Sequence, residues 1–488
     1  MRRAAIANLG CKVNQAEMDA VERLLRARGV ELVDHREPAD LVVVNTCTVT
    51  GIADRKSRQA VRRARRGNPH AQVLVTGCSV AVDPGALASA DPAARLFDNE
   101  SKGRLLAEVA ALVELPTLSG VDRADDQAGR LTPGLESDIE ADEGSVDDDF
   151  ETRMAIDRTR AFVKIEDGCS FHCTYCIIPA ARGPARSVAA DAVLDDVRCA
   201  LAAGHREVVL TGINAGTYDG GAGAGSSLEL PGLVARILAE TPVERIRLSS
   251  IEPQHVTDEL LGVWAGSAGR CLPHFHVPLQ SGDDMILRRM GRRYDSASYA
   301  AVVARIRRAV PGAAVHADVI AGFPGEDDEA WERTVAFLRS LGLAGVHVFR
   351  YSARPGTPAA RMVGQVDSRT KKRRAAQGLA LAAEARARFA EGRIGAEMRV
   401  LFERPLPDGR WLGHAESYVP VAAFAPDGGS LDNAIALVRA ESIDPAVPDR
   451  VVGRVLAVDG APSEPAAAPL GISPAPVAHE PLAEAPYK

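Results

Sequence analysis

The sequence predicts an α/β protein of several domains: an N-terminal parallel α/β sheet, a partial (β/α)6 barrel of the TIM type and a small, OB-like C-terminal antiparallel β-barrel. The length of 488 residues is typical of about three domains. Apolar runs alternate with helical patterns over most of the chain, whereas shorter alternating runs separated by Pro, Asp and Gly precede the C-terminus. The composition, 46% apolar and 25% charged, excludes collagen-like, coiled-coil and wholly disordered chains.

Residues 1–116 are expected to form the sheet domain. Apolar runs predict strands, and segments with apolar residues at helical spacing lie between them, which is the pattern of βαβ units. The strands are expected at residues 5–10, 41–46 and 73–77, and the helices at 14–28 and 53–66. The composition then becomes strongly acidic, so residues 117–154 are expected to be a solvated linker.

Residues 155–392 are expected to form the partial barrel. Six short apolar runs recur there with helical stretches between them, which indicates six β/α units. The runs begin near residues 162, 206, 245, 274, 315 and 346, and a long helix is expected over residues 368–393. The small barrel then covers residues 393–458, and the Ala/Pro-rich residues 459–488 are expected to be a disordered tail.

The net charge of −7 opposes binding to nucleic acid at first sight, because Lys and Arg drive phosphate binding. However, residues 117–151 carry a net charge of −10 and residues 459–488 a net charge of −3, which leaves +6 for the remaining chain. An RNA partner is therefore compatible with the composition. The chain has no apolar run of 18 residues and no signal-peptide core, so we expect a cytoplasmic protein without a membrane partner.

The densest cysteine cluster is a CxxxCxxC triplet directly after the first predicted barrel strand, formed by Cys169, Cys173 and Cys176. Thiolates are the preferred ligands of iron–sulfur clusters and of zinc. Three cysteines leave one iron of a [4Fe–4S] cluster open to another ligand. The alternative is a Cys₃His zinc site that includes His172, although the spacing matches no common zinc motif.

A second set consists of Cys11, Cys47 and Cys78, each of which directly follows a predicted strand of the N-terminal sheet. The carboxyl ends of parallel strands lie at one edge of a sheet, where ligands bind. We therefore expect these three thiols to lie together and to hold a second cluster. The alternative is that all three are buried structural cysteines.

The CxxxCxxC loop at the first barrel strand resembles that of the radical S-adenosylmethionine (SAM) enzymes. The resemblance implies that Cys169, Cys173 and Cys176 hold a [4Fe–4S] cluster and that SAM binds its open iron. It also implies that Tyr175 lies near the adenine of SAM, and that the glycine-containing segment after the second strand receives the methionyl amine. The resemblance then places SAM contacts at the ends of the barrel strands: Thr211, Gly212, Asn214, Ser250, Glu252, Gln280, Ile320 and Gly322.

Two three-cysteine sets, an N-terminal sheet and a small C-terminal barrel together resemble the methylthiotransferases of the radical SAM class. Within that class, the local sequences look most like those of the enzymes that act on threonylcarbamoyladenosine in tRNA. These sequences are GCKVNQ at 10–15, NTCTVT at 45–50, ADRKSRQ at 53–59, CIIPAARG at 176–183, SSIEP at 249–253 and HVPLQSG at 276–282.

The methylthiotransferase resemblance implies two [4Fe–4S] clusters, two uses of SAM and addition of a methylthio group to C2 of the modified adenosine at position 37 of the tRNA anticodon loop. It also implies a sulfur donor, an electron donor of the flavodoxin or ferredoxin type, and a monomer. The alternatives are an enzyme that acts on isopentenyladenosine tRNA or ribosomal protein S12, and a non-catalytic metal-cluster protein that binds RNA.

The C-terminal barrel resembles a TRAM domain, an RNA-binding module. RNA contacts are expected from Arg399, Arg404, Arg410, Trp411 and Tyr418, unless these are ordinary surface arginines and core aromatics. Basic runs at residues 55–66, 288–293 and 369–374 are further candidates for phosphate binding.

Overall fold

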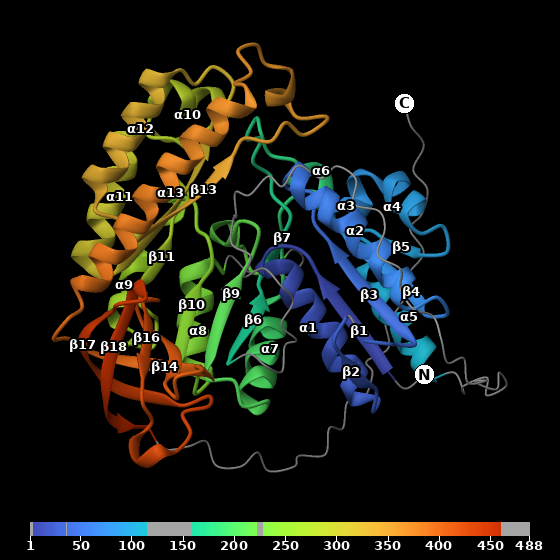
Figure 1. Cartoon of the computed structure of the whole chain (residues 1–488), viewed down its shortest axis with the longest axis horizontal. Coiled ribbons are helices and arrows are strands. Elements are labelled where there is room, and N and C mark those ends of the chain that lie inside the picture. The colour runs from blue at the N-terminus through green and yellow to red at the C-terminus, as the bar shows by residue number, and fades with distance from the viewer. Residues whose placement is uncertain (1–2, 36, 115–158, 222–227, 460–488) are drawn as a thin grey trace.

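The computed structural model describes residues 3–35, 37–114, 159–221 and 228–459, and it divides into an N-terminal sheet, a half-open barrel and a C-terminal ring of strands (Figure 1). The linker predicted at 117–154 lies outside the described residues, as does nearly all of the tail predicted at 459–488. In the described part, no helix combines the length and apolar character needed to cross a membrane.

The N-terminal sheet contains five parallel strands in the order β2-β1-β3-β4-β5. The three predicted strands are confirmed as β1, β3 and β4, and the sequence analysis missed two short edge strands. The strands are β1 (Arg3–Asn8), β2 (Glu31–Val33), β3 (Leu41–Thr46), β4 (Gln72–Gly77) and β5 (Arg95–Phe97). The helices are α1 (Lys12–Ala27), α2 (Gly51–Gly67), α3 (Cys78–Val82), α4 (Pro84–Ala90) and α5 (Lys102–Glu114).

Local sequence explains these elements. Strand β3 has the sequence LVVVNT and is buried along its whole length, as expected for a central strand covered on both faces. Helix α2 begins where the hydroxyl of Thr50 accepts a hydrogen bond from the backbone N–H of Ala53. Asp54 in the first turn of α2 and Arg65 and Arg66 in the last turn complement the helix dipole.

The half-open barrel confirms the six predicted strands. They form two parallel three-stranded sheets, β10-β9-β6 and β11-β12-β13, and isolated bridges between Ile246 and Cys271 and between Ser250 and His276 join the two sheets. The strands are β6 (Arg160–Lys164), β9 (Glu207–Thr211), β10 (Arg245–Leu248), β11 (His274–His276), β12 (Ala314–Ala321) and β13 (Gly345–Arg350). A short antiparallel ribbon, β7 (Glu166–Asp167) and β8 (Arg186–Ser187), follows β6.

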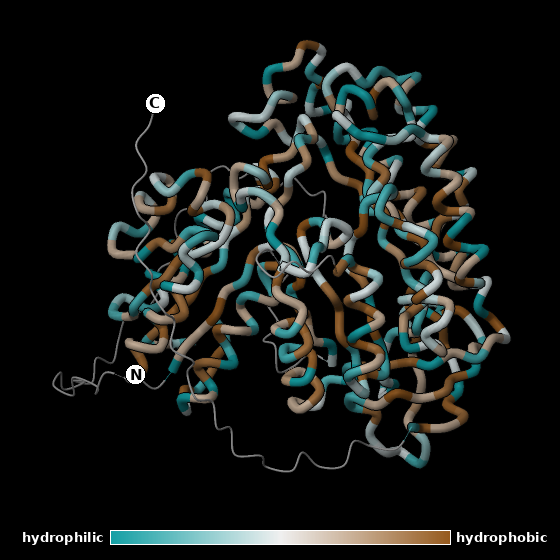
Figure 2. The backbone as a smooth tube through the Cα atoms, turned by 180° about the vertical axis from the view of Figure 1, so that it is seen from behind, coloured by the Kyte–Doolittle hydropathy of each residue, from teal (hydrophilic) through white to brown (hydrophobic). Residues whose placement is uncertain are grey.

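Helices cover the outside of this barrel (Figure 1). They are α7 (Ala190–Ala202), α8 (Leu230–Glu240), α9 (Asp258–Gly266), α10 (Asp284–Met290), α11 (Ser296–Ala309), α12 (Asp328–Leu341) and α13 (Ser368–Glu391). The short helix α6 (Ile178–Arg182) instead lies beside α3 of the N-terminal domain. Helix α13 confirms the predicted long helix. Figure 2 shows hydrophobic residues along the central strands and mixed hydropathy along the surrounding helices.

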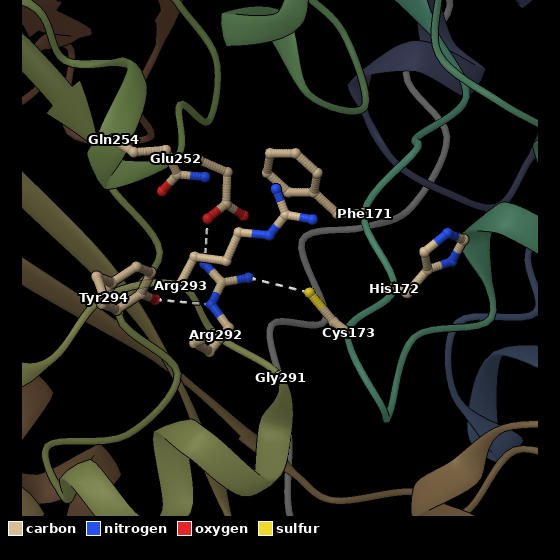
Figure 3. Close-up of a pocket in the computed structure, with 9 residues that line it drawn as sticks. All are labelled: Phe171, His172, Cys173, Glu252, Gln254, Gly291, Arg292, Arg293 and Tyr294. Atoms are coloured by element: carbon tan, nitrogen blue, oxygen red, sulfur yellow. Dashed lines mark hydrogen bonds and ion pairs between the residues drawn. The ribbon is translucent and has the colours of Figure 1, made fainter.

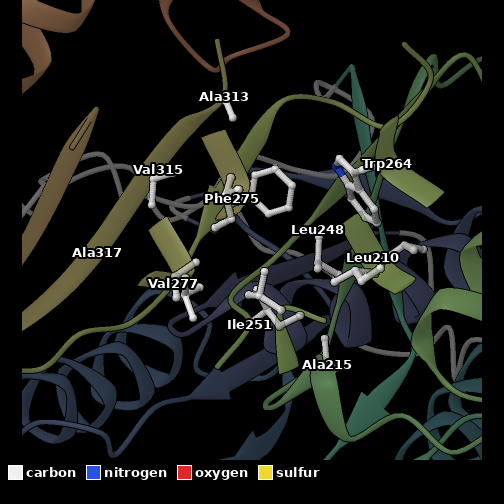
Figure 4. Packing of buried hydrophobic residues seen from close by; sticks show 14 of the residues in the cluster. Leu210, Ala215, Leu248, Ile251, Trp264, Phe275, Val277, Ala313, Val315 and Ala317 are labelled. Carbon is white, nitrogen blue, oxygen red and sulfur yellow. The ribbon is translucent and has the colours of Figure 1, made fainter. Parts of the chain in front are cut away.

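The barrel core lies between the strands and their helices (Figure 4). Along β12, Val315, Ala317 and Val319 belong to this core. Because side chains alternate across a strand, His316 and Asp318 face the inside of the barrel. The inward face of the barrel is therefore polar, as a ligand-binding surface requires.

The C-terminal ring closes on itself in the order β14-β15-β16-β18-β17. It consists of β14 (Glu397–Pro405), β15 (Trp411–Ala415), β16 (Pro420–Ala423), β17 (Ile435–Asp444) and β18 (Val447–Val458). The prediction of a fully antiparallel arrangement is wrong at one position, because β16 and β18 pair in parallel. The connection from β16 to β18 includes the whole of β17. Because β18 runs antiparallel to β17, it can lie beside β16 in the same direction as β16.

The ring contacts residues at the beginnings of the barrel strands. Arg160, the first residue of β6, forms an ion pair with Glu403 at 2.8 Å. Arg245, the first residue of β10, donates to the backbone oxygen of Arg399 at 3.1 Å. The ring therefore covers the end of the barrel opposite to the carboxyl ends of its strands.

Candidate functional site

The CxxxCxxC loop lies between β7 and α6 and is held by backbone hydrogen bonds from both sides. The N–H of Cys169 donates to the oxygen of Gly183 at 3.1 Å, and the N–H of Thr174 donates to the oxygen of Met290 at 2.9 Å. The hydroxyl of Thr174 also donates to the backbone oxygen of Arg289 at 2.8 Å. These contacts fix the loop against the end of α10.

A pocket beside this loop contains a buried arginine (Figure 3). Arg292 donates to the Sγ of Cys173 at 3.4 Å and to the hydroxyl of Tyr294 at 2.9 Å, and it forms an ion pair with Glu252. The pocket is lined by Phe171, His172, Cys173, Glu252, Gln254, Gly291, Arg292, Arg293 and Tyr294. Arg292 therefore connects Glu252, a predicted site residue at the end of a barrel strand, to the cysteine loop.

A mononuclear zinc site that includes His172 finds no support among the described residues. Tetrahedral zinc with thiolate ligands at about 2.3 Å holds the sulfur atoms about 3.8 Å apart. Among the described residues, the group of His, Cys, Asp and Glu side chains close enough together to hold a metal ion is His276, Asp318 and His347, which includes neither His172 nor a cysteine. Figure 3 shows that His172 points away from the sulfur of Cys173.

Several predicted residues at the carboxyl ends of the barrel strands have polar atoms without partners. Among the described residues, the hydroxyl of Thr211, both amide atoms of Asn214 and the hydroxyl of Ser249 are buried and make no hydrogen bond. Native proteins satisfy nearly all buried polar groups, so unpaired groups here indicate a polar ligand. The amine, carboxylate and hydroxyl groups of SAM fit this set.

Gly212 lies where its chain passes close to Glu166. A Cβ atom at Gly212 would lie 2.9 Å from the carboxylate of Glu166. That carboxylate accepts a hydrogen bond from the N–H of Asn214 at 2.8 Å, which holds the loop after β9 against the ribbon. Burial raises the pKa of Glu166 to about 7.

The remaining predicted SAM contacts lie at the ends of β10 to β12. The hydroxyl of Ser250 is 3.3 Å from Nδ1 of His276, and Gln280 has a φ of 71°, unusual for a residue other than glycine. Ile320 is buried near the carboxyl end of β12. Gly322 has a φ of 80°, and a Cβ atom there would clash with Lys371. Tyr175 packs edge-on against Phe323, with ring centroids 6.5 Å apart.

The second cysteine set lies at the carboxyl edge of the N-terminal sheet. Cys11 follows β1, and Cys47 and Cys78 follow β3 and β4. In a sheet of order 2-1-3-4-5, the connection changes direction between β1 and β3, and ligands bind at this point. Burial raises the pKa of Cys47 and of Cys176, from the other set, to about 12, so each thiol must lose a proton when it binds iron.

Gly77 shapes this edge. It has a φ of 101°, and a Cβ atom there would lie 2.3 Å from the backbone oxygen of Thr46. Only glycine lets β4 approach β3 this closely immediately before Cys78. The hydroxyl of Ser79 then donates to the backbone oxygen of Cys47 at 2.8 Å, which links the two cysteine segments.

A buried ionic network that the sequence analysis missed joins the two cysteine sites. The guanidinium of Arg182, six residues after Cys176, donates to Glu17 of α1 at 3.1 Å and to Asp167 at 2.7 Å. It also donates to the side chain of Asn14, which in turn donates to the backbone oxygen of Thr46 at 3.1 Å. The only sequence signal was a cluster of polar residues on a face of α1 that is buried against β6.

Some of the basic and aromatic side chains predicted to contact RNA are buried or partly buried within the protein. Arg292 is buried as described above, and Arg374 is buried in an ion pair with Glu326 at 2.9 Å. The ring of Tyr418 lies 4.7 Å from the guanidinium of Arg247, inside the interface with the barrel, and Trp411 packs against the core of the ring. The predicted RNA contacts of Arg292 and Arg374 are wrong, because each guanidinium is buried in an ion pair. Trp411 and Tyr418 are only partly buried, so their RNA contacts stay predictions.

Comparison with protein families gives two matches. Residues 3–97 match the uncharacterized protein family UPF0004, and residues 163–338 match the radical SAM superfamily. Among solved structures, the radical S-adenosylmethionine methyltransferase TsrM from Kitasatospora setae has a similar fold, with a TM-score of 0.51. It is 16% identical, and the match covers 73% of this chain and 74% of that chain.

Curated relatives are similar over most of the chain. Threonylcarbamoyladenosine tRNA methylthiotransferase MtaB from Bacillus subtilis is 34% identical, over 86% of this chain and 90% of the relative. The enzyme of the same name from Thermotoga maritima is 33% identical, over 86% and 91%. The tRNA-2-methylthio-N(6)-dimethylallyladenosine synthase from Maricaulis maris is 32% identical, over 83% and 87%. With this similarity along nearly its whole length, the chain belongs to the radical SAM methylthiotransferase family.

Proposed function

We propose that this protein converts N6-threonylcarbamoyladenosine at position 37 of the tRNA anticodon loop to its 2-methylthio derivative. The observation that carries the proposal is the pair of three-cysteine sites, connected through Arg182 across the contact between sheet and barrel. The relatives named for threonylcarbamoyladenosine support the choice of substrate.

The two cysteine sets would each hold a [4Fe–4S] cluster: Cys169, Cys173 and Cys176 in the barrel, and Cys11, Cys47 and Cys78 at the sheet. When bound, the clusters and SAM supply reductive cleavage of SAM, hydrogen abstraction and the methylthio group. The unpaired hydroxyl of Thr211 and amide of Asn214 would receive polar groups of SAM. Tyr175, Gly212, Ser250, Glu252, Gln280, Ile320 and Gly322 would complete its surroundings.

The residues of the chain act by positioning. Arg292 donates to Cys173 and would offset the negative charge of a thiolate-bound cluster. Arg182 holds α1 against the cysteine loop and thereby sets the distance between the two sites. Because the C-terminal ring covers the opposite end of the barrel, the substrate base would enter between the sheet and the barrel.

The exposed face of α2 would bind tRNA phosphates. It carries five exposed cations, Arg55, Lys56, Arg62, Arg63 and Arg66, that have no ion-pair partner among the described residues. Single-stranded loop bases can be turned out of the stack for modification, while the backbone is held by charge. The C-terminal ring would act as a TRAM domain through Arg399, Arg404 and Arg410.

The division into an N-terminal domain (1–116), a radical SAM core (155–392) and a TRAM domain (393–458) is part of this proposal. So are action as a cytoplasmic monomer, reduction by a flavodoxin or ferredoxin, and supply of sulfur by a separate donor. Action as a monomer is consistent with the presence of both cysteine sets in one chain.

Anaerobic reconstitution of the full chain tests the proposal, with an anticodon stem-loop RNA that carries threonylcarbamoyladenosine. We expect about eight irons per chain. Cys173→Ala should abolish 5′-deoxyadenosine formation. Cys47→Ala should retain some SAM cleavage but produce no 2-methylthio nucleoside.

Cys199→Ala is the matched control, because Cys199 is exposed on α7 and should leave both products unchanged. Full methylthiolation by Cys47→Ala would refute the role of the N-terminal site. Bound zinc without SAM cleavage would indicate a non-catalytic protein instead.

A further inference from the structure

Lys12 is a half-buried cation directly after Cys11, and the described residues give it no hydrogen bond and no ion pair. It is the first residue of α1, where the helix dipole disfavours positive charge, and the first turn of α1 contains no acidic residue. A lysine at this position therefore costs stability. Its presence is best explained by a negatively charged group that the protein binds.

The electrostatic neighbours of Lys12 include residues of three barrel strands and of the C-terminal ring: Arg247 of β10, His274 of β11, His316 of β12 and Tyr418 of the ring. We call these five residues the Lys12 cluster. The rings of His274 and His316 lie 4.8 Å apart, and the rings of His274 and Tyr418 lie 5.0 Å apart. The cluster therefore lies inside the barrel, between the strands and the ring.

Two further features indicate that this cluster receives a ligand. His274 is 5% exposed, and its Nδ1 has no hydrogen-bond partner among the described residues. Tyr418 has a φ of 69°, a conformation that an aromatic residue adopts only at a cost in energy. The guanidinium of Arg247 lies over the tyrosine ring, 4.7 Å from its centroid.

The other cations near the Lys12 cluster already have carboxylate partners. Arg245 and Arg247 share Glu207, each at 2.8 Å, and Arg160 pairs with Glu403. Asp318 also acts on Lys12, but its carboxylate accepts hydrogen bonds from His276 at 2.7 Å and from His347 at 3.1 Å. Lys12 is thus the cation left to bind an added anion.

Burial lowers the pKa of His316 to about 3, so this imidazole is neutral and adds no charge. The inner surface therefore combines one unpaired ammonium with neutral hydrogen-bonding rings. A small carboxylate that also carries a hydroxyl or amide group matches this combination. An apolar substituent on the substrate would leave the half-buried ammonium of Lys12 without a partner.

We propose that Lys12 recognises the carboxylate of the threonylcarbamoyl group and so selects this substrate over adenosines with neutral N6 substituents. The inference rests on the proposed function and adds the residue that determines specificity. The position of Lys12 beside Cys11 brings the N6 substituent near the N-terminal site, where the methylthio group would be transferred. His274 would donate or accept a hydrogen bond to the same substituent.

The test compares two RNAs with the reconstituted full-length protein. One is an anticodon stem-loop that carries threonylcarbamoyladenosine, and the other is the same RNA with its carboxylate converted to the neutral methyl amide. We expect the wild-type protein to prefer the acid over the amide by about 100-fold in kcat/KM, and in Kd without SAM. Lys12→Met should remove this preference by lowering binding and turnover of the acid RNA only. Lys12→Arg keeps the positive charge and should retain most of the preference.

Lys56→Met is the matched control, because Lys56 is exposed on α2 and should change binding of both RNAs equally. The inference is overturned if the wild-type protein has the same kcat/KM for the acid RNA and the amide RNA. It is also overturned if Lys12→Met lowers kcat/KM equally for both RNAs, as the loss of a structural residue would. It is equally overturned if Lys12→Met leaves the acid unaffected. A wild-type protein that methylthiolates isopentenyladenosine RNA but not threonylcarbamoyladenosine RNA would overturn the proposed function as well.

Discussion

Glu17 is the buried residue on which the contact between sheet and barrel depends most. Its carboxylate pairs with Lys164 at 3.2 Å and with Arg182 at 3.1 Å, and it also contacts Lys102. Burial alone would raise the pKa of Glu17, but these three charges outweigh it and hold the pKa well below its usual range. Glu17 therefore stabilises the contact between sheet and barrel only while its carboxylate is ionised.

Glu17→Gln should destabilise the protein by about 3–5 kcal/mol, because three cations lose their buried counter-charge. Urea denaturation measures the effect. Glu441→Gln, which removes an exposed pair with Arg454, should cost less than about 1 kcal/mol. Equal urea midpoints for Glu17→Gln and Glu441→Gln would contradict the role given to Glu17 at the contact between sheet and barrel.

The effect of Glu17→Gln should depend on pH. The folded pKa of Glu17 is lowered, so its contribution is complete above the unfolded pKa of about 4.3 and is lost as the pH falls below that value. The difference in stability between wild type and Glu17→Gln should therefore be constant from pH 5 to 7 and narrow below about pH 4.3. A difference that widens on acidification would contradict the assigned ion pairs.

Gly77→Ala should destabilise the protein by at least about 2 kcal/mol, because a Cβ atom would clash with Thr46 at a positive φ. The iron content of the N-terminal site should fall with it. Gly67→Ala at the end of α2 meets no atom within 4 Å and should be neutral or slightly stabilising. Thermal unfolding and iron analysis of both variants make the comparison.

At the scale of elements, the loop after β13 forms a second connection between barrel and sheet. Arg354 donates to the hydroxyl of Thr48 at 2.7 Å and forms an ion pair with Asp54 of α2. In the same loop, the hydroxyl of Ser352 accepts a hydrogen bond from the N–H of Gly51 at 3.0 Å. These contacts hold the segment after Cys47 against the barrel.

Arg354→Met should separate the two half-reactions. With the barrel cysteines holding the cluster that cleaves SAM, as proposed above, cleavage should persist. Methylthiolation would need both cysteine sites at a fixed separation and should fall by at least about tenfold. Ser352→Ala, which removes one exposed hydrogen bond, is the milder control. Parallel loss of cleavage and methylthiolation in Arg354→Met would show that this loop does not act on the interface alone.

The strand-end positions of the cysteines were predictable because parallel strands place successive carboxyl ends at one edge. Cys11, Cys47 and Cys78 could be placed after β1, β3 and β4 from the apolar runs that precede them, without knowledge of long-range contacts. The roles of Arg182, Glu17 and Arg354 could not, since each depends on a partner in another domain. The contact of Tyr418 with Arg247 was unpredictable for the same reason, because the sequence does not reveal that the C-terminal ring packs against the barrel.

At the scale of the molecule, charge is divided between regions. Residues 117–151 carry a net charge of −10 in a chain whose total is −7, while α2 presents five exposed cations. Binding of tRNA should therefore weaken with salt in proportion to the phosphates neutralised. The composition alone suggested an acidic protein, and only the position of the charges permits an RNA-binding face.

Replacing Arg62 and Arg63 on α2 by alanine should reduce the slope of log Kd against log salt by about 1.4 to 1.8, because two phosphate contacts are lost. Fluorescence anisotropy with a labelled anticodon stem-loop measures the slope. Arg198→Ala on α7, whose guanidinium pairs with Asp195 at 3.0 Å, should leave it unchanged. Equal slopes for all three proteins would place the RNA elsewhere.

The substrate assignment is tested most directly by nucleoside mass spectrometry of total tRNA from a strain that lacks this chain. The account predicts that the 2-methylthio form of threonylcarbamoyladenosine disappears, that unthiolated threonylcarbamoyladenosine accumulates, and that restoring the gene reverses both changes. Unchanged levels of that 2-methylthio nucleoside, or loss of 2-methylthio-isopentenyladenosine instead, would contradict it.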